Sequence, residues 1–117
     1  MDVKQLVGLT MKAVTVTPGR DEVFFEEEGG RSFRMFHSQN CCEGVDIDEI
    51  DGEIDWLVGS PITQAEESTS NDNPKEEYEE SFTWTFYRFA TAKGHVSIKW
   101  YGSSNGYYSE SVDFEEV

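Results

Sequence analysis

One short stretch of the chain gathers the residue types from which metal and thiol sites are built. It contains His37, Cys41, Cys42, Glu43 and Asp46. A structural zinc site normally takes two cysteines that lie a few residues apart and a second ligand pair elsewhere. Here the cysteines are adjacent, and the chain has one other histidine, His95. A metal site formed by His37, Cys41, Cys42 and Glu43 is therefore kept only as an alternative, and we expect no cofactor.

A cysteine nucleophile is a second possibility for the same stretch. A reactive thiolate needs a cationic neighbour or a helix N-terminus, whereas Cys42 is followed by Glu43 and Asp46, with His37 as the one offsetting group. Adjacent cysteines rarely bridge, because normal disulfide geometry places the Cα atoms ~5.5 Å apart. We therefore expect no structural disulfide, one cysteine packed as a small hydrophobic residue, and a reducing compartment.

The next stretch is acidic and has no basic residue between positions 43 and 55. An EF-hand loop counted from Asp46 would place Ile50 and Asp51 at its fifth and sixth positions, so the calcium pattern fails, although another calcium or magnesium site stays open. Alternate side chains of a strand lie about 6.6 Å apart and could resemble a row of phosphates. We predict an acidic binding face made of Asp46, Asp48, Glu49, Asp51, Glu53 and Asp55. The competing interpretation is a solvated face that maintains solubility.

Residues 102–108 (GSSNGYY) combine glycines, small hydroxyls and paired tyrosines. They lack the spacing of a phosphate-binding loop, and Asn105-Gly106 is a common turn dipeptide. Aromatic side chains here could still stack on a base or ring. The alternative function is thus a module or sponge for a small nucleotide-like ligand, with a site formed by His37, Cys42, Trp100, Tyr101, Asn105, Tyr107 and Tyr108.

Composition limits the partner. The 117 residues include 24 acids and 9 bases, for a net charge of −15. So few scattered bases cannot neutralise nucleic-acid phosphates, and an anionic membrane surface is excluded by the same sign argument. A basic protein is the natural partner. No acid–base pair stands out for hydrolysis, so we expect a binding protein and not an enzyme.

Length and aromatic content indicate one folded domain over 1–117. Hydrophobic residues make up only 37%, but aromatic residues reach 14%, and disordered chains are poor in aromatics. No window approaches the ~20 apolar residues of a membrane helix, and the start lacks the apolar core of a signal peptide. We therefore expect a cytoplasmic protein. Nothing in the sequence addresses its oligomeric state.

Alternation of apolar and polar residues predicts a mainly β fold. About seven antiparallel strands should form a bent sheet, small barrel or sandwich. They are expected at 12–17, 22–27, 31–37, 81–91, 95–101 and 107–114, with a short strand around Val45 and Ile47 and a weak strand at 61–67. Phe82, Trp84 and Phe86 share one face of 81–91, opposite Thr83, Thr85, Tyr87 and Phe89. The spacing of Ile50, Ile54 and Leu57 predicts at most one short helix near 50–58. The polar composition of residues 68–78, together with Pro74, predicts a flexible loop.

Three blocks of the sequence, 36–62, 82–102 and 103–114, share a pattern with other proteins. They contain HSQNCCE, TWTFY and SNGYYS. Together they resemble an uncharacterised domain family found in bacteriophage and some bacterial proteins, over roughly 10–114. The resemblance carries no activity or catalytic residue. It implies a small phage or prophage protein acting in the host cytoplasm, and the acidic face then suggests an inhibitor that binds and blocks a basic host protein, such as a defence or nucleic-acid-handling factor.

Overall fold

Strands make up most of the computed structural model, which describes residues 2–75 and 80–117. The alternating apolar residues form these strands because every second side chain can enter the core. The elements are η1 (Val3–Leu6), β1 (Met11–Val16), β2 (Glu22–Glu27), β3 (Ser32–Phe36), β4 (Gly44–Asp51), η2 (Ile54–Leu57), β5 (Gln64–Ser70), β6 (Ser81–Thr91), β7 (Gly94–Ser104) and β8 (Asp113–Glu116).

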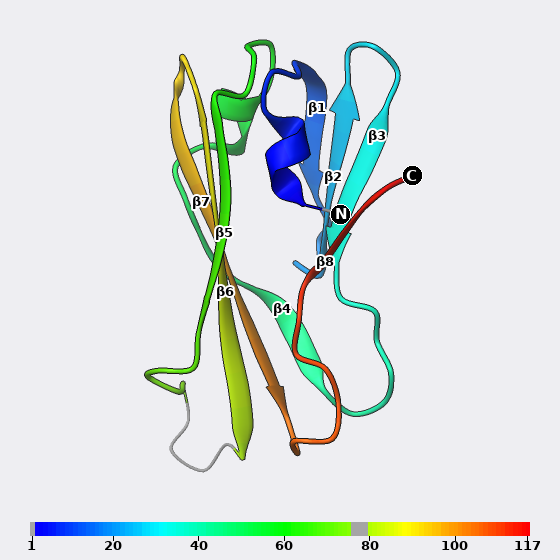
Figure 1. The fold of residues 1–117 in the computed structure, drawn as a ribbon, viewed down its shortest axis with the longest axis vertical. Coiled ribbons are helices and arrows are strands. Elements are labelled where there is room, and N and C mark those ends of the chain that lie inside the picture. Colours follow the sequence, from blue (N-terminus) through cyan, green and yellow to red (C-terminus); the bar gives the residue numbers. More distant parts are fainter. Residues whose placement is uncertain (1, 76–79) are drawn as a thin grey trace.

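The strands form two antiparallel sheets, ordered β1-β2-β3-β8 and β4-β7-β6-β5. The prediction of a mainly β fold is confirmed, and of the architectures left open the sandwich is the one observed: within the described residues neither sheet closes into a barrel. Figure 1 shows that β5, β6 and β7 run the length of the molecule, whereas β1, β2 and β3 cover only one half of it. The other half of that side is occupied by β4 and by the two loops that lead from β3 into β4 and from β7 into β8.

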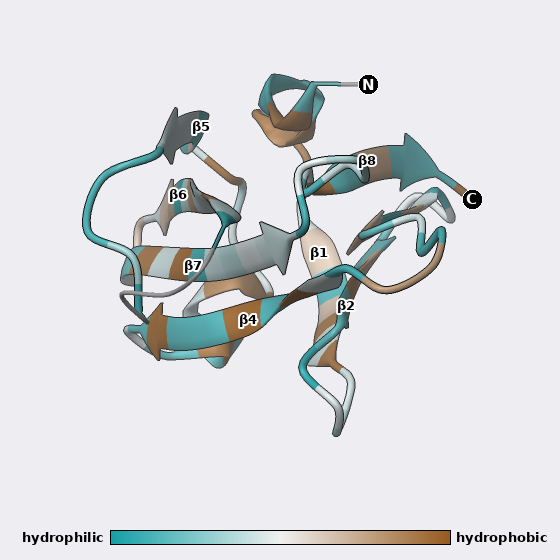
Figure 2. Cartoon of the chain, turned by 90° about the horizontal axis from the view of Figure 1, so that it is seen from below, coloured by the Kyte–Doolittle hydropathy of each residue, from teal (hydrophilic) through white to brown (hydrophobic). Residues whose placement is uncertain are grey.

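The core lies between the sheets. Phe25 of β2 contacts Phe89 of β6 and Phe114 of β8, with ring centroids 5.7 and 6.2 Å apart. The predicted faces of β6 are confirmed: Tyr87 and Phe89 point inward and are fully buried, while Trp84 lies on the outer face with Lys99 over its ring. Figure 2 shows the same alternation as hydrophobic and hydrophilic bands along β4 and β7.

The short helix predicted near residues 50–58 is confirmed, although it is shorter than that range, and a β-bulge in β4 precedes it. The pairing of β4 with β7 shifts between Ile47 and Glu49, and an extra residue in one strand reverses which side chains face inward beyond it. Ile47 and Ile50 can therefore both contact the core although they are three residues apart. Only Ile54–Leu57 is helical, as the 3-10 turn η2, and the second short helix, η1, was not predicted.

The predicted strand at 107–114 is wrong. The strand β7 extends to Ser104 and the last strand covers only Asp113–Glu116, which pairs with β3 in the other sheet. Gly102, expected in a turn, lies inside β7, where a Cβ atom would stand 2.8 Å from the backbone oxygen of Glu110. The missing side chain lets the segment 109–112 cross β7 closely.

The loop predicted at 68–78 begins later than expected. Residues up to Ser70 belong to β5, and 71–75 follow it outside any strand. Residues 76–79 lie outside the described residues, so the predicted flexibility stays a prediction.

Candidate functional site

The ring of His37 is held between two acceptors. Its Nε2 atom lies 2.8 Å from Oε2 of Glu43 and its Nδ1 atom 2.7 Å from the backbone oxygen of Ser111. The side chains of His37 and Glu43 are 3% and 0% exposed. A carboxylate and a carbonyl oxygen only accept hydrogen bonds. The ring of His37 therefore links the carboxylate of Glu43 to the backbone of Ser111.

Glu43 also orders the loop that precedes it. Its carboxylate accepts the backbone N–H groups of Asn40 and Cys41, each at 2.9 Å, and Gln39 donates to its backbone oxygen at 2.6 Å. The N–H group of Cys41 and the ring of His37 lower the pKa of Glu43 to about 2, against the opposing effect of burial. We call residues 37–43 the clasp, because this loop joins β3 to β4 and holds the segment 109–112 through Ser111.

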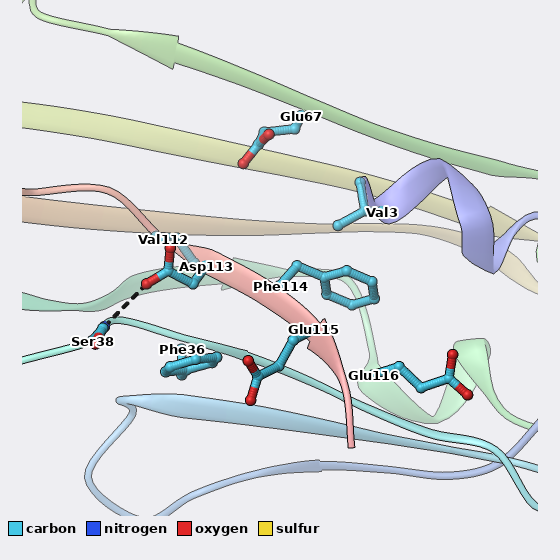
Figure 3. A pocket seen from close by; sticks show the side chains of 9 residues that line it. All are labelled: Val3, Phe36, Ser38, Glu67, Val112, Asp113, Phe114, Glu115 and Glu116. Carbon is cyan, nitrogen blue, oxygen red and sulfur yellow. Dashed lines mark hydrogen bonds between the residues drawn. The ribbon is translucent and has the colours of Figure 1, made fainter. Parts of the chain in front are cut away.

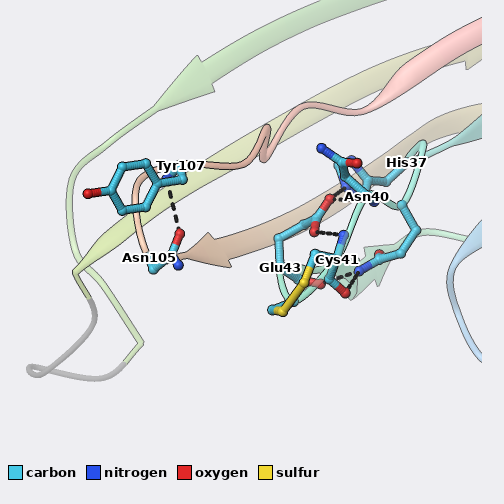
Figure 4. Close-up of a disulfide and its surroundings, with 8 residues drawn as sticks. His37, Asn40, Cys41, Glu43, Asn105 and Tyr107 are labelled. Carbon is cyan, nitrogen blue, oxygen red and sulfur yellow. Dashed lines mark hydrogen bonds and ion pairs between the residues drawn. A yellow bond between two sulfur atoms is a disulfide. The ribbon is translucent and has the colours of Figure 1, made fainter.

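The two cysteines lie on the outside of the clasp and are bonded to each other. Both are exposed, so the expectations of free thiols and of one packed cysteine are wrong. Figure 4 shows the disulfide on the edge of the loop, with the carboxylate of Glu43 between it and His37. The bridge joins neighbouring residues and ties no distant parts of the chain together. Its sulfur atoms are not thiols that could act as nucleophiles.

The metal alternative gains no support from the geometry. In residues 2–75 and 80–117, no three His, Cys, Asp or Glu side chains lie close enough to hold one metal ion. Within the clasp, the carboxylate of Glu43 is already occupied by His37 and two backbone N–H groups. His37 and Glu43 instead join the loop between β3 and β4 to the segment 109–112.

The residues of the alternative ligand site do not converge. Trp100 is fully buried in the core, and its Nε1 atom has no hydrogen-bond partner among the described residues. Tyr101, the next residue of β7, lies on the opposite face beside Trp84, with ring centroids 4.3 Å apart. Tyr107 is 89% exposed on a turn in which Asn105 accepts its backbone N–H group. Figure 4 shows this turn apart from His37 and the disulfide, and Tyr108 is half-buried next to it.

Four of the six predicted acids come together on β4. Asp46, Asp48, Glu49 and Asp51 follow the outer side of this edge strand, and we call them the β4 acids. Glu53 and Asp55 lie beyond the strand end, at and in η2, and are exposed. Burial raises the pKa of Asp46, and the carboxylates of Asp48 and Asp21 raise it further against the influence of Lys75. Negative charge is therefore crowded at fixed positions on β4.

Residues 71–75 cross the outer face of the same sheet, and we call them the strap. The indole N–H of Trp84 donates to the backbone oxygen of Asn73 at 2.9 Å, and the N–H of Lys75 donates to the hydroxyl of Tyr101 at 3.3 Å. The ammonium group of Lys75 reaches Asp48 at 2.7 Å. The strap thus covers aromatic side chains of β6 and β7 and ends on the β4 acids.

A groove lies between the sheets on the side of the edge strands β5 and β8. It consists of two adjoining hollows of about 690 and 490 Å³ that share Glu67, Val112 and Asp113. The first is also lined by Val3, Phe36 and Phe114, and Figure 3 shows Glu67 across from Asp113 and Phe114. The second contains Thr83, Thr85 and Glu110. Among the described residues, no lysine or arginine lines either hollow.

The polar groups of the groove are fixed by hydrogen bonds. Glu67 accepts the hydroxyl of Tyr87 at 2.5 Å. Glu110, which is 9% exposed, accepts the hydroxyls of Thr83 and Ser104 at 2.8 and 2.6 Å. Burial raises the pKa of Tyr87, and the bond to Glu67 and the charges of Glu67 and Asp113 raise it further. The carboxylates of β5 and β8 are thus close enough to act on the same hydroxyl.

Comparison with known proteins places most of the chain in one family. Residues 4–114 match the model of a domain of unknown function (DUF7448). The chain belongs to this family. No curated protein and no solved structure matches this DUF7448 domain. No helix in the described part of the chain is long and apolar enough to cross a membrane.

Membership in this family assigns no reaction to the DUF7448 domain. Sequence reasoning missed the groove residues Glu67, Glu110 and Asp113 and treated the strap only as a loop. One signal was present: Thr83, Thr85 and Tyr87 share the face of β6 that also carries Phe89. Hydroxyls on a strand face that enters the core indicate a polar hollow within it.

Proposed function

We propose that this chain is a binding protein without enzymatic activity, which captures a basic protein through the β4 acids and blocks the surface that the captured protein uses for other ligands. Neighbouring carboxylates on β4 take the place of phosphates on such a surface. The observation that carries the proposal is the row formed by Asp46, Asp48, Glu49 and Asp51 on one edge strand. A row of carboxylates at fixed positions is complementary to a cationic surface.

The backbone supports this role, because it presents the acids in a fixed arrangement. β4 pairs with β7 along its length, from Gly44 opposite Ser103 to Asp51 opposite Ser97. The N–H of Ile47 also donates to the backbone oxygen of Arg20 in the turn between β1 and β2, at 2.7 Å. Charges on such a strand lose little conformational entropy when a partner binds.

Nearby cations compensate only part of this charge. Lys75 pairs with Asp48, and Lys99 is the β7 residue opposite Glu49, with its ammonium group over the ring of Trp84. Within the described residues, Asp48 is the one β4 acid with an ion-pair partner. A partner that brings lysine or arginine side chains to Asp46, Glu49 and Asp51 would complete this surface.

The identity of the partner is a finer part of the proposal. The three sequence blocks that resemble a phage domain family support an origin in a phage or prophage, with a host defence or nucleic-acid-handling protein as the target in the host cytoplasm. The rival function, a nucleotide-like ligand held by Trp100, Tyr101 and Tyr107, has no comparable support, because these side chains lie in the core, on the outer face and in solvent.

The experiment is a capture assay with matched variants. Tagged chain is incubated with bacterial lysate at low salt, and bound proteins are quantified by mass spectrometry. The β4 variant carries Asp46→Asn, Glu49→Gln and Asp51→Asn. The control variant carries Glu26→Gln, Glu28→Gln and Glu66→Gln, which removes the same charge from exposed acids elsewhere.

We expect a basic protein that is captured by the wild type and the control, lost with the β4 variant, and released as salt rises. Equal capture by both variants would show that the β4 acids are not the binding face. Equal loss with both variants would show that net charge alone governs binding.

A further inference from the structure

The groove concentrates negative charge without a matching cation. Glu67 and Asp113 both influence the hydroxyl of Tyr87, and Glu110 is buried behind them. In residues 2–75 and 80–117, none of these three carboxylates has a lysine, arginine or histidine partner within ion-pair distance. Their partners are hydroxyl and backbone N–H groups.

An unused hydroxyl points to a ligand in the same place. Thr85 lines the second hollow and is only 2% exposed. Its side chain has no hydrogen bond with any described residue, unlike Thr83 beside it and Thr91 at the end of β6. Because Thr85 lines the hollow, a donor that enters the hollow can bind this hydroxyl.

The spacing of the carboxylates favours an ammonium ion over a metal ion. A calcium or magnesium site gathers several oxygen ligands around one centre, and no three acidic side chains of the described residues are close enough for that. An ammonium group carries its own N–H donors and needs only acceptors nearby. Several separate acceptors along one groove suit a ligand with more than one such group.

The apolar part of the groove suits the chain between those groups. Val3, Phe36, Val112 and Phe114 line the first hollow, next to Glu67 and Asp113. Figure 3 shows Val3 of η1 and Phe114 of β8 on the two sides of this hollow. Methylene groups gain free energy by contact with such side chains.

We infer that the groove binds an unbranched alkyl ligand with at least two ammonium groups, a diamine or polyamine. One ammonium group lies between Glu67 and Asp113, the alkyl chain lies along Val112 and Phe114, and a second ammonium group reaches Thr85 and Glu110. This site is separate from the β4 acids and does not depend on the proposed capture of a basic protein.

The test is calorimetric titration of the purified chain with spermidine, cadaverine and pentylamine at ~150 mM salt, where the Debye length is ~8 Å. The groove variant carries Glu67→Gln and Asp113→Asn, changes that keep acceptors for Tyr87 and Ser38. The control carries Asp46→Asn and Glu49→Gln and removes the same charge from β4. We expect the groove variant, which loses two carboxylates, to bind spermidine at least roughly tenfold more weakly, since each charged hydrogen bond is worth about that factor. The control should match the wild type.

Thr85→Val separates binding from folding. Removal of an unpartnered hydroxyl should leave the urea midpoint unchanged or raised, while spermidine affinity falls several-fold. Three results would overturn the inference: equal weakening in the groove variant and the control, pentylamine bound as tightly as cadaverine, or Thr85→Val with unaltered affinity. Native circular dichroism of each variant confirms that losses of binding are not losses of fold.

Discussion

His37 and Glu43 form a buried hydrogen-bonded pair in the connection between the two sheets, with Nε2 and Oε2 2.8 Å apart. The pair joins two distant parts of the chain, because the other ring nitrogen contacts the backbone oxygen of Ser111. His37 and Glu43 therefore fix the loop between β3 and β4 against the segment 109–112.

Replacement of His37 by Phe should destabilise the chain strongly. The change removes both hydrogen bonds of the ring, each worth about 0.5–1.5 kcal/mol, and leaves the carboxylate of Glu43 without its histidine partner. Equilibrium unfolding in urea measures the loss. The matched control is Cys41→Ser with Cys42→Ser, because the exposed bridge lies outside the clasp. A His37→Phe chain as stable as this control would contradict the clasp.

Stability should fall in acid through Glu43. Its pKa is lowered from 4.5 to about 2 in the folded chain. A carboxyl group whose pKa is lower in the folded than in the unfolded chain stabilises the fold at pH values above its unfolded pKa. This stabilisation is lost as the pH falls and the carboxylate binds a proton. Between pH 4.5 and about 2, the wild type should therefore lose more stability than Glu43→Gln, which cannot titrate. Urea midpoints across this range test it, and parallel curves for the two chains would refute the assignment.

Gly102 should not tolerate a methyl group. A Cβ atom there would lie 2.8 Å from the backbone oxygen of Glu110, and backbone atoms cannot give way as a flexible side chain does. We expect Gly102→Ala to cost about 1–3 kcal/mol, the range for overpacking. Gly44→Ala is the control, since no atom lies within 4 Å of its Cβ position. Thermal melts of both variants give the comparison, and equal melting temperatures would argue against close crossing of β7 by 109–112.

The ion pair of Lys75 with Asp48 should contribute little to stability. The two side chains are 48% and 24% exposed, and such pairs are worth ~0.2–1 kcal/mol in water. A double-mutant cycle with Lys75→Met and Asp48→Asn should give a coupling energy in this range that shrinks as salt rises. A salt-independent coupling well above ~1 kcal/mol would mean that the strap end is buried and not a surface contact.

The local patterns of the sequence were enough for most strands. The predicted bounds of 22–27 and 81–91 match β2 and β6, because strict alternation and the short turns next to them leave one register that buries Phe25, Tyr87 and Phe89. The short helix predicted near 50–58 is observed as the 3-10 turn η2 at Ile54–Leu57. Ile50 lies outside that helix, because the pairing of β4 with β7 extends to Asp51.

Relations between distant segments could not be predicted. The contact of His37 with Ser111 joins residues 74 positions apart, and the groove is built from Glu67, Thr85 and Asp113 on three strands of two sheets. Chemistry-bearing residues close in sequence, such as Trp100 and Tyr101, were grouped although they face opposite sides of β7. Of the six acids grouped by proximity in sequence, four lie on one strand, β4, and Glu53 and Asp55 lie beyond its end.

The most direct test of the proposed function uses the basic protein captured in the lysate assay, purified and titrated into the wild type and the β4 variant. The account predicts at least roughly tenfold weaker binding by the variant, the effect of losing charge-assisted contacts, and a shallower dependence of affinity on salt. Equal affinity and equal salt dependence for the two chains would contradict the claim that Asp46, Glu49 and Asp51 form the binding face.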